Sequence, residues 1–166
     1  MKYLFVLLFI IVFCLFDKNL GYTNASPWWT HFTYLFQHAG IVHLLINSLS
    51  FIGMFRLLEK FINRWVLSVS VITVGFVASF LSMYNAPTVG ASAMVYAMVG
   101  IFFSMVNLCG DIKILDKKKF AVFIVGIAAC LFISASKGNS NFFLHVFSLI
   151  LGLIAGTVIA IFREEM

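Results

Sequence analysis

Apolar residues are gathered into long runs that short polar breaks separate, and this pattern is typical of a polytopic membrane protein. A helix that spans the hydrocarbon core needs about 20 predominantly apolar residues. The runs predict six membrane-spanning helices, over residues 3–16, 41–58, 65–84, 92–109, 120–135 and 141–162. No linker, repeat or low-complexity tract divides the sequence. We therefore expect an all-α membrane protein in which residues 1–166 form a single domain.

The first run is shorter than a full span and Lys2 precedes it, so it also resembles a secretory signal peptide. The stretch that follows, LGYTNAS, offers only a poor small-x-small cleavage site. The sequence therefore favours a retained first helix over a cleaved signal.

Composition supports the membrane assignment and changes how the charge is interpreted. Hydrophobic residues make up 63% of the 166 residues, and charged residues only 10%. A soluble domain of this length cannot hide so much apolar surface, because a large share of any small fold is surface. The formal net charge of +5 is therefore treated as a signal of topology, and no nucleic-acid partner is expected.

Lysine and arginine residues fall mainly on one side of the six-span arrangement. With the N-terminus inside, only Lys18 and Lys137 lie on outer segments. The other nine lie on inner segments: Lys2, Arg56, Lys60, Arg64, Lys113, Lys117, Lys118, Lys119 and Arg163. Such residues in short loops favour the cytoplasmic side. The bias predicts an N-in/C-in protein, with the cell (inner) membrane as its expected location.

Polar residues occur inside three of the predicted spans, at the ends that face outward. The second span carries His43 and Asn47, the fourth carries Ser92 and Tyr96, and the sixth carries His145. At about 1.5 Å of rise per residue, these groups reach a similar depth in the outer leaflet. Both pairs have i,i+4 spacing and so share a helix face. Polar groups inside a membrane usually face a bundle interior or a water-filled cavity.

Ser92 stands at the start of its predicted helix, directly after the stretch TVGA. Gly90 in that stretch permits a tight or left-handed backbone. Backbone N–H groups at a helix start have no intrahelical partner and lie at the positive end of the dipole, which suits a nucleophile and its oxyanion. A serine nucleophile needs a nearby base, normally histidine. His43 has an amide one turn away and suits hydrogen-bond donation, so spacing favours His145 as the base.

Several other kinds of chemistry lack the residues they need. All six acidic residues lie at span ends or in loops: Asp17, Glu59, Asp111, Asp116, Glu164 and Glu165. This argues against an aspartyl intramembrane protease, and without an HExxH motif we expect no metal and no cofactor. A serine hydrolase would therefore work with a Ser–His dyad. The cysteines lie in or at the ends of apolar runs and suggest no disulfide framework: Cys14, Cys109 and Cys130.

Each of these features also has a packing interpretation. Small residues let membrane helices approach closely, which alone accounts for one set of positions: Gly90, Ala93, Ala97 and Gly100. Ser92, Tyr96 and Asn47 also fit hydrogen bonding or packing between helices. His145 is the hardest to explain in this way, because ionisable groups inside a membrane are usually functional.

The connection between the first two spans is rich in aromatic residues. We expect an aromatic belt at the membrane interface, or an outer loop embedded in the leaflet, from Trp28, Trp29, Phe32, Tyr34 and Phe36. His31 and His38 are expected to serve the structure of this loop or the interface.

Three motifs, in order and in three spans, resemble those of the rhomboid family of intramembrane serine proteases. They are HAGIVHLLINSLSF with His38, His43 and Asn47, VGASAMVYAMVG with Gly90, Ser92 and Tyr96, and HVFSLILG with His145 and Gly152. The six-span core matches as well, so the resemblance covers nearly the whole chain. It implies a six-helix rhomboid-like bundle that cleaves transmembrane segments of other proteins, within the bilayer and near its outer face.

The resemblance also implies a role for each site residue. Ser92 is the nucleophile and His145 the general base, with Tyr96 packed against the imidazole ring. His43 and Asn47, with backbone N–H groups near Ser92, form the oxyanion hole, supported by the adjoining residues Gly90 and Ala91. The KGNSN segment, residues 137–141, would act as a flexible cap, and substrates would enter between the second and fifth spans.

Two departures from the family pattern concern activity. Ala93 stands where the family has a glycine after the serine, and Ser148 stands where a small residue, glycine, is expected after the histidine. The runner-up interpretation is accordingly an inactive rhomboid-like protein that binds membrane clients. A third, a bis-histidine haem or metal protein, needs His43 and His145 to face one cofactor.

Overall fold

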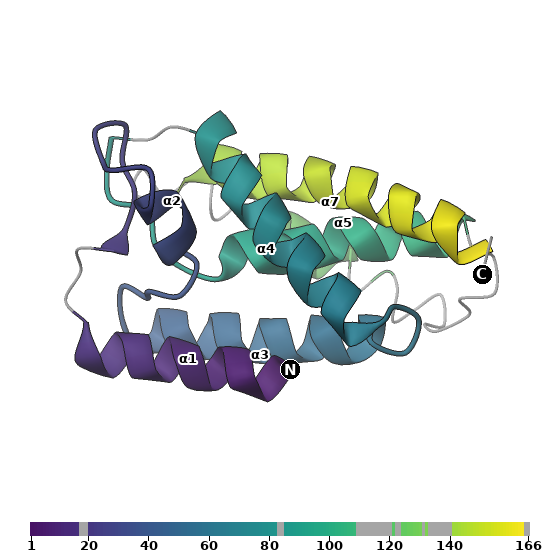
Figure 1. Cartoon of the computed structure of the whole chain (residues 1–166), viewed down its shortest axis with the longest axis horizontal. Coiled ribbons are helices and arrows are strands. Elements are labelled where there is room, and N and C mark those ends of the chain that lie inside the picture. The colour runs from purple at the N-terminus through teal and green to yellow at the C-terminus, as the bar shows by residue number, and fades with distance from the viewer. Residues whose placement is uncertain are drawn as a thin grey trace.

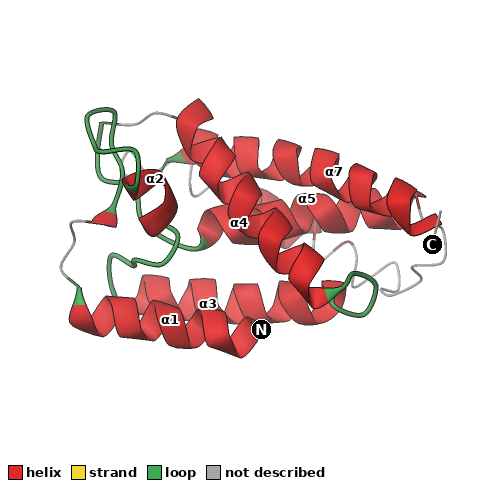
Figure 2. Cartoon of the chain, in the orientation of Figure 1, coloured by secondary structure: helices red, strands yellow, loops and turns green. Residues whose placement is uncertain are grey.

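The computed structural model describes residues 1–16, 20–82, 85–108, 121, 124–130, 132 and 141–164. Nearly all of its regular structure is helical (Figure 2). Residues 124–130 are helical, and the named helices are α1 (Lys2–Leu15), α2 (Thr30–Thr33), α3 (Ile41–Leu58), α4 (Arg64–Leu81), α5 (Ser92–Leu108) and α7 (Phe142–Glu164). Extended pairing in the described residues is limited to one isolated antiparallel bridge between Tyr22 and Thr88.

Three of these helices, α3, α4 and α7, are long and apolar enough to cross a membrane. The helices α1 and α5 are apolar but shorter. The predicted fifth span, residues 120–135, is described only in part, at residues 121, 124–130 and 132. The count of six spans therefore stays a prediction.

The predicted helix ends agree with the structure to within a few residues. The bounds of α3 are those predicted, because Gly40 precedes it in extended conformation and polar residues follow it. Helix α4 begins one residue early, at Arg64, because the side chain of Asn63 accepts the Trp65 N–H at the helix start. It ends at Leu81, where the backbone leaves the helical region at Ser82.

The helices form a bundle in which α1 lies beside α3, and α4 crosses the closely packed pair α5 and α7 (Figure 1). The starting ends of α3, α5 and α7 lie at the same end of the bundle as α2 (Figure 1). The α3–α4 turn and the C-terminus lie at the opposite end. This arrangement brings the N-terminal residues of three helices together, as the depth of their polar residues predicted.

Helices α5 and α7 approach one another at glycines. A Cβ atom on Gly152 would lie 2.8 Å from Ala97 Cα, and one on Gly156 would lie 2.7 Å from Ile101 Cα. Ser104 Oγ adds a hydrogen bond, 2.6 Å long, to the carbonyl of Leu153. Small residues therefore do pack these two helices, as the packing interpretation expected, and the glycine contacts hold the site residues of the two helices close together.

The aromatic connection between α1 and α3 is partly a core rather than a belt. Trp28 and Trp29 are exposed, as an interface belt requires. The belt interpretation is wrong for Tyr34 and Phe36, which are buried, and the alternative, an outer loop embedded in the leaflet, stays a prediction. Tyr34 can be buried because its hydroxyl donates a 2.8 Å hydrogen bond to the Gly75 carbonyl of α4.

Candidate active site

Ser92 and His145 meet at the α2 end of the bundle. Ser92 is the first residue of α5, and His145 lies in the first turn and a half of α7. The Oγ atom of Ser92 lies 3.0 Å from Nε2 of His145. This is hydrogen-bond distance, and it is the separation that proton transfer between a hydroxyl and an imidazole requires.

Tyr96 holds the imidazole from one side. It lies one turn after Ser92 on α5, and its ring stacks on that of His145 with the centroids 4.6 Å apart and the planes inclined by 26°. Tyr96 is itself buried. The ring orientation of His145 is therefore fixed by both a hydrogen bond and a stack.

Gly90 forms the backbone beside this pair. Its φ angle is +125°, a region that side-chain-bearing residues rarely adopt. A Cβ atom there would also lie 2.7 Å from Cε1 of His43 and 3.4 Å from Nδ2 of Asn47. Gly90 is thus required both for the turn into α5 and for the close approach of two α3 side chains.

His43 and Asn47 both face the segment that leads into Ser92. The amide nitrogen of Asn47 is buried and has no hydrogen-bond partner among the described residues. His43 Nδ1 accepts a long hydrogen bond, 3.5 Å, from the Ala39 N–H. A neutral His43 ring then carries its proton on Nε2, the nitrogen that approaches Gly90. The Asn47 amide and His43 Nε2 therefore both present N–H donors beside Gly90, which precedes Ser92 by two residues.

His38 supports the same segment from the loop before α3. Its Nε2 atom accepts a long hydrogen bond, 3.5 Å, from the N–H of Ala91. Burial, and secondly the charge of the neighbouring His43, lower the pKa of His38 to about 4. A neutral ring at physiological pH is what allows that nitrogen to accept. His31, the other loop histidine, is also buried, and its Nδ1 lies 2.9 Å from Ser79 Oγ.

Asn141 was expected only as the last residue of a flexible cap, and the sequence did not indicate the buried, hydrogen-bonded role that it has. Its side chain is buried and contacts Tyr22, Ser82 and Thr88, three residues from distant parts of the chain. An asparagine directly before a helix is a recognisable capping signal. Its other partners have no sequence signal, because they come together only in the fold. The rest of the expected cap, residues 137–140, lies outside the described residues.

The two departures from the family pattern are both buried at this site. Ala93 and Ser148 are each fully buried, and the hydroxyl of Ser148 has no hydrogen-bond partner among the described residues. Within the described residues, Cys14 and Cys130 are free, and no group of three His, Cys, Asp or Glu side chains suits a metal ion. Cys109 lies outside those residues.

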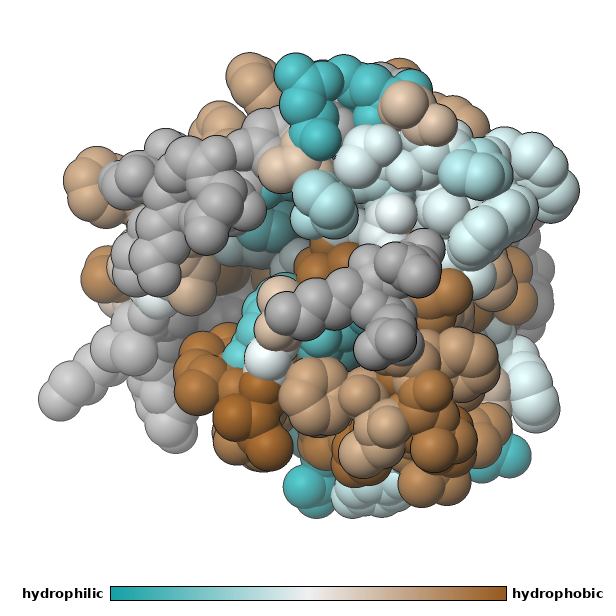
Figure 3. All heavy atoms as spheres, turned by 90° about the vertical axis from the view of Figure 1, so that its left-hand side faces the viewer, coloured by the Kyte–Doolittle hydropathy of each residue, from teal (hydrophilic) through white to brown (hydrophobic). Residues whose placement is uncertain are grey.

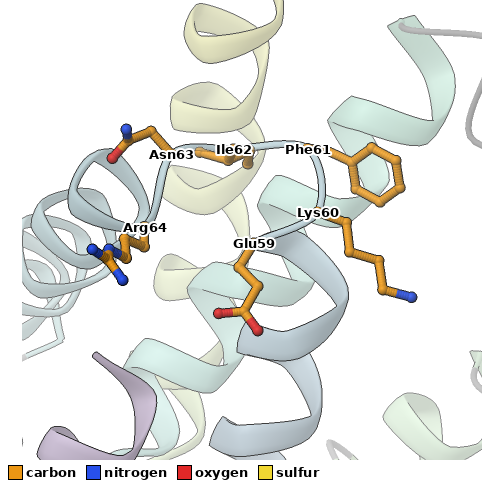
Figure 4. A pocket seen from close by; sticks show the side chains of 6 residues that line it. All are labelled: Glu59, Lys60, Phe61, Ile62, Asn63 and Arg64. Carbon is orange, nitrogen blue, oxygen red and sulfur yellow. The ribbon is translucent and has the colours of Figure 1, made fainter.

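The end that carries the site combines polar and apolar surface. Figure 3 looks onto this end, where hydrophilic atoms gather along the upper rim and near the middle, above a strongly hydrophobic lower part. A separate pocket, of about 450 Å³, lies at the opposite end and is lined by residues 59–64 (Figure 4). There Glu59 pairs with Lys2, while Lys60 and Arg64 point away from one another. That pocket contributes nothing to the Ser92 site.

These observations describe a helical membrane protein with a serine–histidine pair at one end of its bundle. Comparison with known protein families gives a match to the Rhomboid domain over residues 25–162. The chain therefore belongs to the rhomboid family, and the resemblance seen in its motifs is confirmed. It is also 26% identical over 140 residues to a Bacillus subtilis (strain 168) protein named "Putative rhomboid protease YdcA", a match that covers 82% of this chain and 69% of that protein.

Proposed function

We propose that this protein is an intramembrane serine protease that hydrolyses peptide bonds in or near transmembrane segments of other membrane proteins. The observation that carries the proposal is the 3.0 Å approach of Ser92 Oγ to His145 Nε2, with Tyr96 stacked on the imidazole. Membership of the rhomboid family and the name of the Bacillus relative support it. The substrates are then membrane proteins in the same bilayer, and residues 1–166 act as one domain.

Acylation begins at Ser92. As its Oγ bonds to the scissile carbonyl carbon, His145 Nε2 takes the hydroxyl proton and the carbonyl oxygen becomes an oxyanion. The same nitrogen then gives this proton to the departing amine nitrogen as the C–N bond breaks. His145 next takes a proton from a water molecule that attacks the ester carbon. It returns this proton to Ser92 Oγ as the ester C–O bond breaks and the acid product leaves.

The oxyanion is stabilised by donors from α3 and from the start of α5. Asn47 Nδ2 has hydrogens that no described residue accepts, and His43 Nε2 is its neighbour beside Gly90. The first backbone N–H groups of α5 add to them, because a helix start leaves such groups unpaired. The N–H of Ala91 points instead to His38, so we assign Ala91 to support rather than to direct donation.

No acid is assigned to the site. Among the described side chains, the Glu59 carboxylate is paired with Lys2 at the other end of the bundle. In the proposed dyad, Tyr96 takes over part of what an acid does in a triad, because stacking fixes the plane of the imidazole. The positive-inside bias supports an orientation in which the dyad lies toward the outer face, and we take the membrane to be the cell (inner) membrane.

A fluorophosphonate probe followed by peptide mapping tests this function. In purified protein we expect one labelled serine, Ser92, and loss of both labelling and cleavage in Ser92→Ala and His145→Ala. The two losses should be strongly non-additive because dyad members act as a unit. Ser48→Ala is the matched control, since it removes a buried hydroxyl from α3. Labelling of another serine, or wild-type turnover by Ser92→Ala, would refute the assignment of Ser92 as the nucleophile. An inactive client-binding protein would show neither labelling nor cleavage.

A further inference from the structure

A buried cluster of polar groups joins four segments beside the dyad, and we call it the Asn141 cluster. It consists of Tyr22, Ser82, Thr88 and Asn141, all of which are buried. The amide nitrogen of Asn141 lies 2.9 Å from Tyr22 Oη, 3.0 Å from the Ser82 carbonyl oxygen and 3.3 Å from Thr88 Oγ1. The Tyr22 hydroxyl also contacts Ser82, at 3.1 Å from its Oγ. One side chain therefore connects the start of α7 to the end of α4 and to two loops.

Asn141 also fixes the first turn of the helix that carries His145. Its Oδ1 atom accepts the N–H of Leu144 at 3.1 Å, which is an N-cap hydrogen bond. Leu144 is buried and directly precedes His145. This hydrogen bond thus fixes the backbone at the start of α7, one residue before His145.

The same amide reaches the segment that carries Ser92. Thr88 exchanges two backbone hydrogen bonds with Tyr22, of 3.2 and 2.9 Å. Two residues further on, the N–H of Gly90 donates to the Tyr34 carbonyl at 2.9 Å. The backbone from Thr88 to Gly90 is therefore fixed at both ends, and Ser92 lies two residues after Gly90.

We propose that Asn141 is a positioning residue that sets the separation between Ser92 and His145. The inference rests on the proposed function. Asparagine suits the role because one side chain offers both a donor and an acceptor. Its acceptor holds the α7 end, and its donor holds the α5 entry segment through Thr88. Proton transfer needs a separation of roughly 2.6–3.2 Å, and a displacement of about 1 Å costs on the order of 10²-fold in rate.

The test compares Asn141→Ser with a matched control in the same pair of helices. Serine can still cap α7 but has no amide donor, so kcat should fall about 10-fold or more while KM stays within about 2-fold. Ser104→Ala is the control: it removes the buried hydrogen bond from α5 to the Leu153 carbonyl of α7, far from the dyad. Ser104→Ala should lower the melting temperature and leave kcat unchanged. If Asn141 had a purely structural role, Asn141→Ser would behave in the same way.

Two partner variants keep the inference testable if Asn141→Ser does not fold. Thr88→Val and Tyr22→Phe each remove one oxygen that faces the Asn141 amide, and each should lower kcat by several-fold. The Asn141→Ser/Thr88→Val double variant should lose less than the product of the single losses, since both break one network. Unchanged kcat in the folded variants would overturn the positioning role.

The control reactions separate failure of this inference from failure of the proposed function. Cleavage by the wild type, together with loss of cleavage in Ser92→Ala, tests the proposed protease function independently of the role of Asn141. If that contrast holds but the cluster variants retain wild-type kcat, only the positioning role is wrong. If the wild type neither cleaves a transmembrane substrate nor reacts with a fluorophosphonate, both proposals are wrong.

Discussion

Gly100 of α5 lies directly against Gly152 of α7: a Cβ atom on Gly100 would lie 2.8 Å from the carbonyl carbon of Gly152. The atoms in the way are backbone atoms, which cannot turn aside as a flexible side chain can. The separation of the two helices at this level is therefore set by the absence of side chains. Because the same helices carry Ser92 and His145, their spacing is coupled to the geometry of the dyad.

Gly152→Ala should impair both stability and turnover. The new methyl group would overlap the backbone at Ala97, so α5 and α7 must move apart, at a cost of about 1–3 kcal/mol of overpacking. The Ser92–His145 hydrogen bond should lengthen, and kcat should fall. Melting temperature and kcat measured on the same preparation check this expectation.

Gly53→Ala is the matched control for that experiment. Gly53 lies within α3, and no atom of the described residues lies within 4 Å of a Cβ atom placed there. Alanine should leave kcat unchanged and stabilise the helix by up to about 1 kcal/mol. Equal behaviour of the two variants would mean that the α5–α7 contact tolerates a methyl group and does not set the dyad geometry.

Asn47→Ala should lower kcat far more than it raises KM. The oxyanion exists only after attack, so a donor aimed at it stabilises the transition state rather than the bound substrate. Removal of one such donor costs about 10²–10³-fold in kcat in soluble proteases. The loss here is expected at the lower end because His43 and backbone N–H groups share the role. Kinetics with a transmembrane substrate measure it.

Ser48→Ala separates this role from packing, because Ser48 is the buried neighbour of Asn47 and its hydroxyl has no hydrogen-bond partner among the described residues. It should keep wild-type kcat. An Asn47→Ala variant with a lower melting temperature but normal turnover of the folded enzyme would remove Asn47 from the oxyanion hole.

The parts of the site that the sequence could predict are those that depend on depth and helix period. Ser92 and His145 were expected together because each lies near the end of an apolar run that the charge bias predicts to face outward, and Tyr96 because it shares a helix face with Ser92. Asn141 shows what could not be predicted. Its contact with Tyr22 joins residues 119 positions apart, and its contact with Thr88 joins residues 53 apart. Such contacts leave no periodic trace in a sequence.

The wrong expectation that Tyr34 belongs to an aromatic belt also arises from a contact between residues far apart in the sequence. Tyr34 is amphipathic, and a tyrosine beside an apolar run is typical of a membrane interface. Its burial became possible only because Gly75, 41 residues away, offers a carbonyl to its hydroxyl. Burial keeps the pKa of Tyr34 well above its ordinary value, so the side chain remains a neutral donor. Composition alone does not distinguish a tyrosine at the membrane interface from one that is buried in the fold.

The stability of the α2 end should depend on pH through His31. Its ring stacks on those of Tyr22 and Phe80. Burial lowers its pKa below the ordinary value of 6.5. The unfolded chain then binds more protons than the folded one near that value, so stability should be greatest above about pH 6.5 and fall as the pH is lowered through it.

Thermal melts in detergent at about pH 7.5 and about pH 5.5, about one unit on either side of the ordinary histidine pKa, measure this effect. His31→Phe keeps the stack and removes the titrating group, so its melting temperature should fall less on acidification. His38, whose pKa burial lowers to about 4, should supply part of the remaining slope. An unchanged acid sensitivity in His31→Phe would show that this histidine does not titrate on unfolding.

Ala25 and Lys60 should be labelled from opposite sides of the membrane. Both residues are exposed, and they lie in connections at opposite ends of the bundle (Figure 1). The positive-inside bias predicts that the Lys60 turn lies in the cytoplasm and the α2 end outside. In a background without native cysteines, an impermeant maleimide should label Ala25→Cys in intact cells, but Lys60→Cys only after permeabilisation. The reverse pattern would show that the topology is inverted and that the dyad lies toward the cytoplasm. Labelling of both positions from outside would contradict a membrane-spanning α3, because that helix lies between them in the chain.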